Sequence, residues 1–241
     1  MMSKVKQRVV VFTGAGISAE SGLATFRDPD GLWAKYSIEE VATPEAWERQ
    51  PELVLDFYNQ RRRQLLEVKP NAAHYALVEL ESLFEEVHII TQNIDDLHER
   101  AGSTNVLHLH GELRKVRSSR YPELIYAWDD DVHLGDLCER GYQLRPHVVW
   151  FGEEVPLFPV AADIVGQADV LIVVGTSLAV YPAASLAYRV FGEIPCYYVD
   201  PTPQLSRDAF SAAPLHIVKR NASEGVPLVV SWLRERFQAG S

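Results

Sequence analysis

Residues 9–27, VVVFTGAGISAESGLATFR, decide the fold of this chain. A short apolar, β-branched run that leads into a glycine turn is how a doubly wound α/β sheet presents backbone N–H groups to a phosphate. The turn does not meet the dinucleotide fingerprint G-x-G-x-x-G, because Ala19 stands where the third glycine belongs. The loop also carries more polar side chains than a pyrophosphate cradle needs, namely Ser18, Glu20, Ser21 and Arg27. We therefore expect a charged ligand at this loop, and we expect its mode of binding to differ from that of a dinucleotide in an ordinary dehydrogenase.

The composition favours a folded enzyme over a nucleic-acid-binding protein. With 241 residues, 47% of them hydrophobic, the chain suits one large domain or a domain with a smaller insertion. A formal net charge of −10 argues against nucleic acid as a partner, and an acidic surface can attract basic protein segments. Cys138 and Cys196 form no disulfide framework or C-x-x-C pair. No signal peptide and no apolar stretch of about 18 residues is found, so we expect no membrane partner and a cytoplasmic location.

Apolar runs alternate with helical segments along most of the chain. Strands are predicted at residues 8–13, 87–91, 106–109, 148–151, 170–175, 196–200 and 215–218. Helices are predicted at residues 44–49, 51–67, 71–83, 158–168, 182–191 and 226–237. This alternation indicates an α/β fold with a Rossmann-like, doubly wound parallel sheet. Residues 1–32, 84–113 and 146–241 are expected to form this domain, and the insertions 33–83 and 114–145 a smaller helical module.

Four short strings follow predicted strands, where ligands collect in this architecture. They are GAG at 14–16, QNID at 92–95, HG at 110–111 and GTS at 175–177. Each string alone has an ordinary structural interpretation. Thr176 or Ser177 could cap a following helix, and His110 could bond a neighbouring carbonyl. The order of all four along one chain makes the signal specific.

That order resembles the sirtuins, the family of NAD-dependent protein lysine deacylases. The matching strings are residues 13–27, TQNID at 91–95, LHG at 109–111, RPHVVWFGE at 145–153, GTSL at 175–178 and Ala222 before GVP at 225–227. The resemblance spans nearly the whole chain. It points to the branch of bacterial sirtuins that removes succinyl and malonyl groups.

The resemblance implies a binding site for NAD, which is consumed as a co-substrate. It places the glycine loop at the pyrophosphate, Gln92 and Asn93 at the ribose, and Asp95 at the nicotinamide carboxamide. Asp200 stands where many relatives have asparagine, so either it accepts from ribose hydroxyls or that contact is rearranged. The implied NAD-binding residues are Gly14, Ala15, Gly16, Ser18, Glu20, Phe26, Arg27, Trp33, Gln92, Asn93, Ile94, Asp95, Gly175, Thr176, Ser177, Asp200 and Ala222.

The chemistry implied by the resemblance makes sense of the catalytic candidates His110, Asn93 and Asp95. An acyl-lysine amide oxygen is a weak nucleophile, so its attack on the ribose depends on alignment and charge stabilisation as nicotinamide leaves. A base must then deprotonate a ribose hydroxyl, and the imidazole of His110 titrates in the right range. The products would be free lysine, nicotinamide and 2′-O-acyl-ADP-ribose.

The substrate is expected to be an acylated lysine in a protein. The string VVWFGE resembles the strand with which the family pairs substrate backbone, a mode that tolerates varied sequences. Its implied substrate-binding residues are Val148, Val149, Phe151, Gly152 and Glu153. The alternative interpretation is a buried core strand, and Val148 and Phe151 could serve both purposes.

Tyr58 and Arg61 share one face of a predicted helix because they are three residues apart. This spacing resembles the sirtuin branch that removes malonyl, succinyl and glutaryl groups, and Ala42 resembles the small residue that widens its pocket. A guanidinium can grip a carboxylate with two bonds, and a phenol can add a third. The alternative is that Arg61-Arg62-Arg63 forms a solvated basic face. Deacetylation is expected alongside, because a pocket for a longer acid also admits acetyl.

Most sirtuins hold a structural zinc ion with four cysteines, and this chain lacks them. Ser118 stands where the first cysteine is expected, and within 115–144 only Cys138 offers a thiol. His133 would not complete a tetrahedral set, so we predict no metal site. Apolar packing would have to replace the metal, and the candidates are Tyr121, Leu124, Ile125, Tyr126, Trp128, Leu134, Leu137 and Tyr142.

Three other functions compete with deacylation. An NAD-dependent mono-ADP-ribosyltransferase would share the first half of the mechanism. A catalytically silent reader of NAD or acyl-lysine is disfavoured because His110, Asn93 and Asp95 are all present. A hydride-transfer dehydrogenase is disfavoured by the unmet fingerprint.

Overall fold

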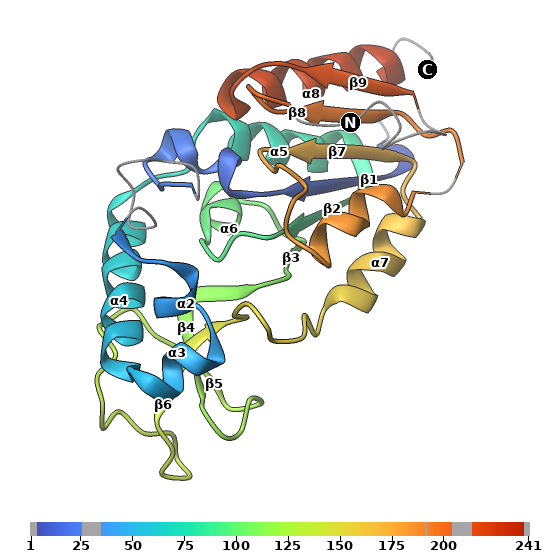
Figure 1. Ribbon diagram of the computed structural model, residues 1–241. Coiled ribbons are helices and arrows are strands. Elements are labelled where there is room, and N and C mark those ends of the chain that lie inside the picture. The colour runs from blue at the N-terminus through green and yellow to red at the C-terminus, as the bar shows by residue number, and fades with distance from the viewer. Residues whose placement is uncertain (1–3, 26–34, 191, 204–213, 239–241) are drawn as a thin grey trace.

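A six-stranded parallel sheet forms the larger part of the molecule (Figure 1). The computed structural model describes residues 4–25, 35–190, 192–203 and 214–238. The strands lie in the order β3-β2-β1-β7-β8-β9, and every pair is parallel. Their bounds are β1 Val5–Thr13, β2 Phe84–Thr91, β3 Val106–His108, β7 Val170–Val174, β8 Cys196–Val199 and β9 Leu215–Val218. The order reverses between β1 and β7, so the predicted doubly wound sheet is confirmed.

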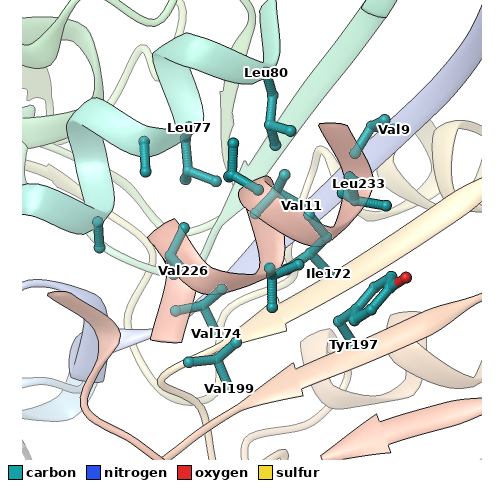
Figure 2. Close-up of a cluster of buried hydrophobic side chains, with 14 of the residues drawn as sticks. Val9, Val11, Leu77, Leu80, Ile172, Val174, Tyr197, Val199, Val226 and Leu233 are labelled. Atoms are coloured by element: carbon teal, nitrogen blue, oxygen red, sulfur yellow. The ribbon is translucent and has the colours of Figure 1, made fainter. Parts of the chain in front are cut away.

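Helices cover both faces of this sheet, as the continuous apolar strands require. Helices α5 (Ala72–Leu83) and α8 (Ala222–Gln238) pack on one face, where Val9 and Val11 of β1 meet Leu77 and Leu233 (Figure 2). On the other face α7 (Phe158–Gly166) and the 3-10 segment η3 (Ala183–Tyr188) cover the alternate β1 residues, Val10 and Phe12. Successive side chains of β1 therefore pack alternately into two separate apolar cores, one on each face of the sheet.

The smaller module combines helices with a sheet, whereas the sequence predicts a helical module. Its helices are α2 (Ile38–Val41), α3 (Pro44–Arg49) and α4 (Pro51–Glu67). Its antiparallel sheet has the order β5-β4-β6, formed by Ile125–Ala127, Gly111–Ser118 and Leu144–Val148. The strands were missed because charged and polar residues interrupt their apolar alternation, as in the sequence GELRKVRS of β4.

The apolar packing expected in place of a metal is realised in part. Leu55 of α4 joins Val116, Val132, Cys138 and Leu144 in a buried cluster. Of the eight expected packing residues, Leu124, Tyr126 and Trp128 pack against it. Ile125, Leu134, Leu137 and Tyr142 are instead exposed. Tyr121 lies between Tyr142 and the guanidinium of Arg140.

Several predicted boundaries differ from the structure. Helix α5 packs on α8 and β2, so it belongs with the large sheet although residues 33–83 were expected in the small module. We propose that the first insertion ends near residue 70. The strand predicted at 148–151 is wrong, because β6 ends at Val148 and the chain then turns. Helix α8 begins at Ala222, four residues before its prediction, and carries Pro227 inside it. The short helix α6 (Leu97–Ala101) was not predicted.

Within the described part of the chain, no helix is both long enough and apolar enough to cross a membrane.

Candidate functional site

One cavity of about 460 Å³ collects the residues that the sequence singled out. It opens where the carboxyl ends of β1, β2, β7 and β8 face the small module. Its walls include His110 and these predicted ligand-binding residues: Gly14, Ala15, Gly16, Ser18, Glu20, Ala42, Tyr58, Arg61, Gln92, Asn93, Ile94, Asp95, Val148, Val149, Phe151, Gly152, Glu153, Gly175, Thr176, Ser177, Asp200 and Ala222. Phe26, Arg27 and Trp33 lie outside the described residues.

The glycine loops after β1 and β7 touch backbone to backbone. A Cβ atom on Gly14 would lie 2.7 Å from the Cβ of Thr176, and one on Gly16 would lie 2.6 Å from the Cα of Gly175. Gly175 has a φ of +59°, and a Cβ there would lie 2.5 Å from the backbone N of Ile17. The amide of Gly16 donates to the carbonyl of Gly175 at 2.8 Å. Only glycine fits these positions, so the turn leaves room for a ligand beside bare backbone.

The loop after β1 continues as two short 3-10 turns, η1 (Ala15–Ile17) and η2 (Ala19–Ser21). A dinucleotide fingerprint requires a regular α-helix that starts directly at the glycine turn. The absence of that helix over 15–21 explains why the third glycine was not needed. Gly22 then reverses the chain with a φ of +99°.

Two contacts hold this loop in place. The Asn71 side-chain amide donates to the carbonyl of Ile17 at 2.8 Å and to the Ser21 hydroxyl at 2.9 Å. The Glu20 carboxylate accepts from the backbone N of Ser223 at 2.9 Å and from its hydroxyl at 2.6 Å. The loop is therefore fixed to the first turns of α5 and α8. Asn71 was not identified from the sequence. Its position before a helix predicts a cap, but nothing in the sequence indicates that the same side chain also bonds the loop after β1.

The string after β2 forms a connected polar network with the loop after β1. The hydroxyl of Ser18 donates to Oδ2 of Asp95 at 2.9 Å, and Nδ2 of Asn93 donates to that hydroxyl at 3.2 Å. Burial raises the pKa of the Asp95 carboxyl, while bonds from the Leu97 amide and Ser18 oppose the shift. Nε2 of Gln92 donates to the Thr176 hydroxyl at 3.0 Å, which ties β2 to β7 across β1.

His110 lies half-buried on the cavity wall with a fixed tautomer. Its Nδ1 lies 3.0 Å from the carbonyl oxygen of Gln92, which can only accept, so Nδ1 carries the proton. Nε2 is then the basic nitrogen. Burial lowers the pKa of His110 below its usual 6.5, against the smaller opposing effect of the Gln92 carbonyl. The imidazole is therefore neutral at pH 7, and its hydrogen bond to the Gln92 carbonyl agrees with the structural interpretation of His110 without excluding a functional one.

Asp200 and Ala222 line the cavity from the residue after β8 and from the start of α8. Both are buried. Oδ1 of Asp200 accepts from the backbone N of Thr202 at 2.8 Å, so one oxygen of this carboxylate already orders the turn that follows.

Tyr58 and Arg61 enter the cavity from α4, as their spacing predicted. The Arg61 guanidinium carbon lies 5.9 Å from the centre of the Tyr58 ring. Burial lowers the pKa of Arg61, while Tyr58 and Asp95 act in the opposite direction. Ala42 lies on the same wall and is almost fully buried.

The three arginines 61–63 do not form a solvated basic face. Arg62 is fully buried and donates to the carbonyl of Leu113 at 2.9 Å and to Oδ1 of Asn59 at 2.8 Å. Arg63 is exposed and pairs with Asp131. Of the three, only Arg61 lines the cavity. Three consecutive arginines of one helix therefore lie in the cavity wall, in the interior and at the surface.

The segment after β6 lies between the two parts of the molecule. The amide of Val149 donates to the carbonyl of His110 at 2.9 Å, and the amide of Phe151 donates to the carbonyl of Ala42 at 3.0 Å. Glu153 lines the cavity, yet its carboxylate accepts from Arg145 at 2.8 Å and from the Trp150 amide at 2.8 Å. Glu153 is thus held by neighbouring groups, and we propose that it orders this segment.

Several cavity residues were not identified from the sequence. They are Leu23, Ala24, Thr25, Gln64, Leu65, Leu113, Trp150, Val155, Val180, Tyr181, Pro182, Val199, Pro201, Thr202 and Asn221. Most are apolar, and nothing in their spacing separates a cavity wall from a core. Trp150 is the exception, because a tryptophan between Val149 and Phe151 implies a polar partner for its indole N–H.

Within the described residues, no group of three or more His, Cys, Asp or Glu side chains is arranged to hold a metal ion. In the stretch where a zinc site was considered, the Cys138 thiol instead donates to the Ser118 hydroxyl at 3.4 Å. That hydroxyl also accepts from the amides of Arg120 and Tyr121. Ser118 and Cys138 thus close the turn through hydrogen bonds.

Comparison with known proteins gives one consistent result. The model of the Sir2 family matches residues 14–182. An NAD-dependent protein deacylase of Helicobacter pylori is 59% identical over 195 residues, which cover 81% of this chain and 85% of that protein. A Sir2 homologue solved in complex with NAD superposes with a TM-score of 0.81 at 39% identity, covering 95% of this chain and 90% of the other. A Sir2 protein bound to acetylated peptide gives 0.75 at 31% identity, covering 96% and 93%.

The contact between Asn71 and the loop after β1 gives a first prediction. Asn71→Asp keeps the oxygen that caps α5 through the Ala73 amide, but removes the donor to Ile17 and Ser21. Loss of one such bond costs about 1 kcal/mol. Hydrogen exchange of amides 17–22 should therefore accelerate about three- to tenfold. Asn105→Asp, which removes a donor to the Val87 carbonyl, is the matched control and should leave these amides unchanged. Equal exchange in both variants would contradict the assigned role.

Proposed function

The chain belongs to the Sir2 family, and from that premise we propose that it is an NAD-dependent protein-lysine deacylase that removes acetyl, succinyl and malonyl groups. One observation carries the proposal. The glycine loops, His110 and the pair Tyr58–Arg61 all line the same cavity. That reaction requires a dinucleotide site and a base and, for acidic acyl groups, a receptor for a carboxylate.

The residues around the glycine loops fit NAD. The loops carry no side chain at Gly14, Gly16 and Gly175, so a pyrophosphate can approach their backbone closely. The volume of about 460 Å³ is in the range of small-molecule sites. Asn93, Ser18 and Asp95 present amide, hydroxyl and carboxyl groups on one wall, suited to a ribose and a carboxamide. NAD supplies an electrophilic sugar carbon and nicotinamide as leaving group.

His110 is the general base in this proposal. The Gln92 carbonyl holds the proton on Nδ1, so Nε2 is available to accept one from a ribose hydroxyl. The lowered pKa keeps that nitrogen unprotonated at neutral pH. Because the His110 carbonyl also accepts from the Val149 amide, the base is coupled to the segment expected to bind substrate.

The acyl group is expected to enter beside Ala42, Tyr58 and Arg61. A desolvated guanidinium favours a negatively charged acyl end more strongly than it would in water. Arg61 and Tyr58 together offer donors for both oxygens of a carboxylate. Acetyl-lysine is shorter and neutral, and it leaves this end of the cavity unused. The acylated lysine belongs to a protein whose backbone pairs with Val148–Gly152.

We further propose that the small module is folded without zinc. The supporting observations are the Cys138–Ser118 hydrogen bond and the apolar cluster around Val116 and Leu144. These contacts occupy the stretch in which the family's cysteines would lie.

The deacylase proposal is tested with acetyl-, succinyl- and malonyl-lysine peptides, with and without NAD, followed by mass spectrometry. His110→Ala should lower kcat by about 10²–10⁴-fold for every acyl group, because general-base catalysis contributes that much. In the wild type, burial lowers the pKa of His110, so the base stays neutral and kcat/KM should decline only below pH 6.5. This acidic limb should vanish in the variant.

His133→Ala, at an exposed histidine of the small module, is the control and should behave as wild type. Full activity of His110→Ala would refute the assigned mechanism. ADP-ribose attached to protein without any acyl substrate would favour a mono-ADP-ribosyltransferase instead.

The acyl preference is tested with Arg61→Met. A hydrogen bond between charged groups contributes about 1.5–3 kcal/mol, so kcat/KM for succinyl-lysine should fall about 10- to 150-fold. The value for acetyl-lysine should change far less, because acetyl has no carboxylate. Arg63→Met removes an exposed arginine two positions away and should leave both values unchanged. Equal losses for the two acyl groups in Arg61→Met would contradict the acidic-acyl assignment.

Metal independence is tested by dialysis against a strong chelator. Because packing and hydrogen bonds connect the small module, the melting temperature and deacylation rate should both remain unchanged. A lower melting temperature that zinc restores would show that the module depends on a metal.

A further inference from the structure

Tyr58 is hydrogen-bonded to Trp150, which lies in the string VVWFGE but was not among the predicted site residues. Nε1 of Trp150, in the segment after β6, lies 3.1 Å from the Tyr58 hydroxyl oxygen. Both side chains are 2% exposed, and both line the cavity. The pair joins α4 to the substrate-binding segment at the end of the cavity that holds Arg61.

The direction of this hydrogen bond is fixed by chemistry. An indole N–H can only donate, so the Tyr58 oxygen must accept. A phenol that accepts one bond keeps its own O–H for donation. Among the described residues, no acceptor for the Tyr58 O–H is found in the structure. The hydroxyl proton is thus reserved for a group that enters the cavity.

Trp150 is itself held on two sides. The Arg145 guanidinium carbon lies 3.3 Å from the centre of the indole ring, and Arg145 pairs with Glu153 at 2.8 Å. Glu153 also accepts from the Trp150 backbone N at 2.8 Å. A cation on the ring face draws electron density from the indole, which strengthens its N–H as a donor. The side chain is therefore locked with its N–H on Tyr58.

We propose that Trp150 is a specificity-positioning residue, which orients the Tyr58 hydroxyl as a hydrogen-bond donor to the carboxylate of an acidic acyl-lysine. This inference rests on the proposed preference for succinyl and malonyl groups. Without Trp150, the phenol could rotate and accept from water or from Arg61, and its donor would no longer face the acyl end. Acetyl-lysine carries no carboxylate, so its binding does not depend on this orientation.

A distinct kinetic signature follows. The acyl carboxylate lies several bonds from the reacting amide, so its contact with Tyr58 is the same in the ground state and the transition state. Loss of such a contact raises KM and leaves kcat nearly unchanged. General loosening of the cavity would instead affect kcat and both acyl groups.

The test measures kcat and KM for succinyl- and acetyl-lysine peptides in Trp150→Phe, Tyr58→Phe and the double variant. Trp150→Phe should lower the succinyl-to-acetyl ratio of kcat/KM about five- to tenfold, through KM for succinyl. In the Tyr58→Phe background the same substitution should add little, because the oriented hydroxyl is already absent. If Trp150→Phe fails to fold, benzothienylalanine at position 150 replaces only the N–H with sulfur and serves in its place.

Trp47→Phe is the matched control. Its ring packs 5.8 Å from that of Trp150, but it does not line the cavity, so its replacement should leave the ratio unchanged. An unchanged ratio in Trp150→Phe, where Tyr58→Phe lowers it, would overturn this inference and leave the proposed function intact. An unchanged ratio in both Tyr58→Phe and Arg61→Met would instead overturn the acidic-acyl assignment, and this inference with it.

Discussion

The close approach of two glycine loops is the constraint on which the site depends. The chain leaves β1 at Gly14 and β7 at Gly175, where the strand order reverses, and the loops meet with no space for a Cβ atom. Ligands of doubly wound sheets bind at such a reversal. The backbone contact also fixes the start of the loop over 15–21. Asn71, at the start of α5, bonds to this loop, and Glu20 of the loop bonds to Ser223 of α8.

The second half of the site comes from the small module, and hydrogen bonds align the two halves. Val149 bonds to the carbonyl of His110, and Phe151 bonds to the carbonyl of Ala42. His110 and Ala42 are therefore bonded to two positions of one segment, Val149 and Phe151, that are two residues apart. A shift of that segment would move His110 and Ala42 together, which would keep the proposed base aligned with the proposed acyl pocket.

The sequence predicted the parallel sheet well, because strands buried on both faces are continuous apolar runs such as VLIVV of β7. It also predicted which strings share the site, since parallel strands end at one edge. It failed for β4 and β6, which pair with each other, and the carbonyl of Leu113 in β4 also accepts a hydrogen bond from the buried cation of Arg62. Pattern alone cannot reveal such a partner. Trp150 was missed for a similar reason, because its role depends on Tyr58, 92 residues away along the chain.

Under the proposed acyl preference, the electrostatics around Arg61 would allow one pocket to take both neutral and acidic groups. Burial disfavours the charge of Arg61, and the nearby Asp95 supports it. A neutral acetyl group leaves that interaction in place, so it enters without disturbing the cation. A carboxylate would add a close partner to this partly buried guanidinium, and the gain would exceed that of the same contact at a surface. The proposed selectivity for acidic acyl groups would then arise from the interactions that the carboxylate gains, and it would require no element that rejects acetyl.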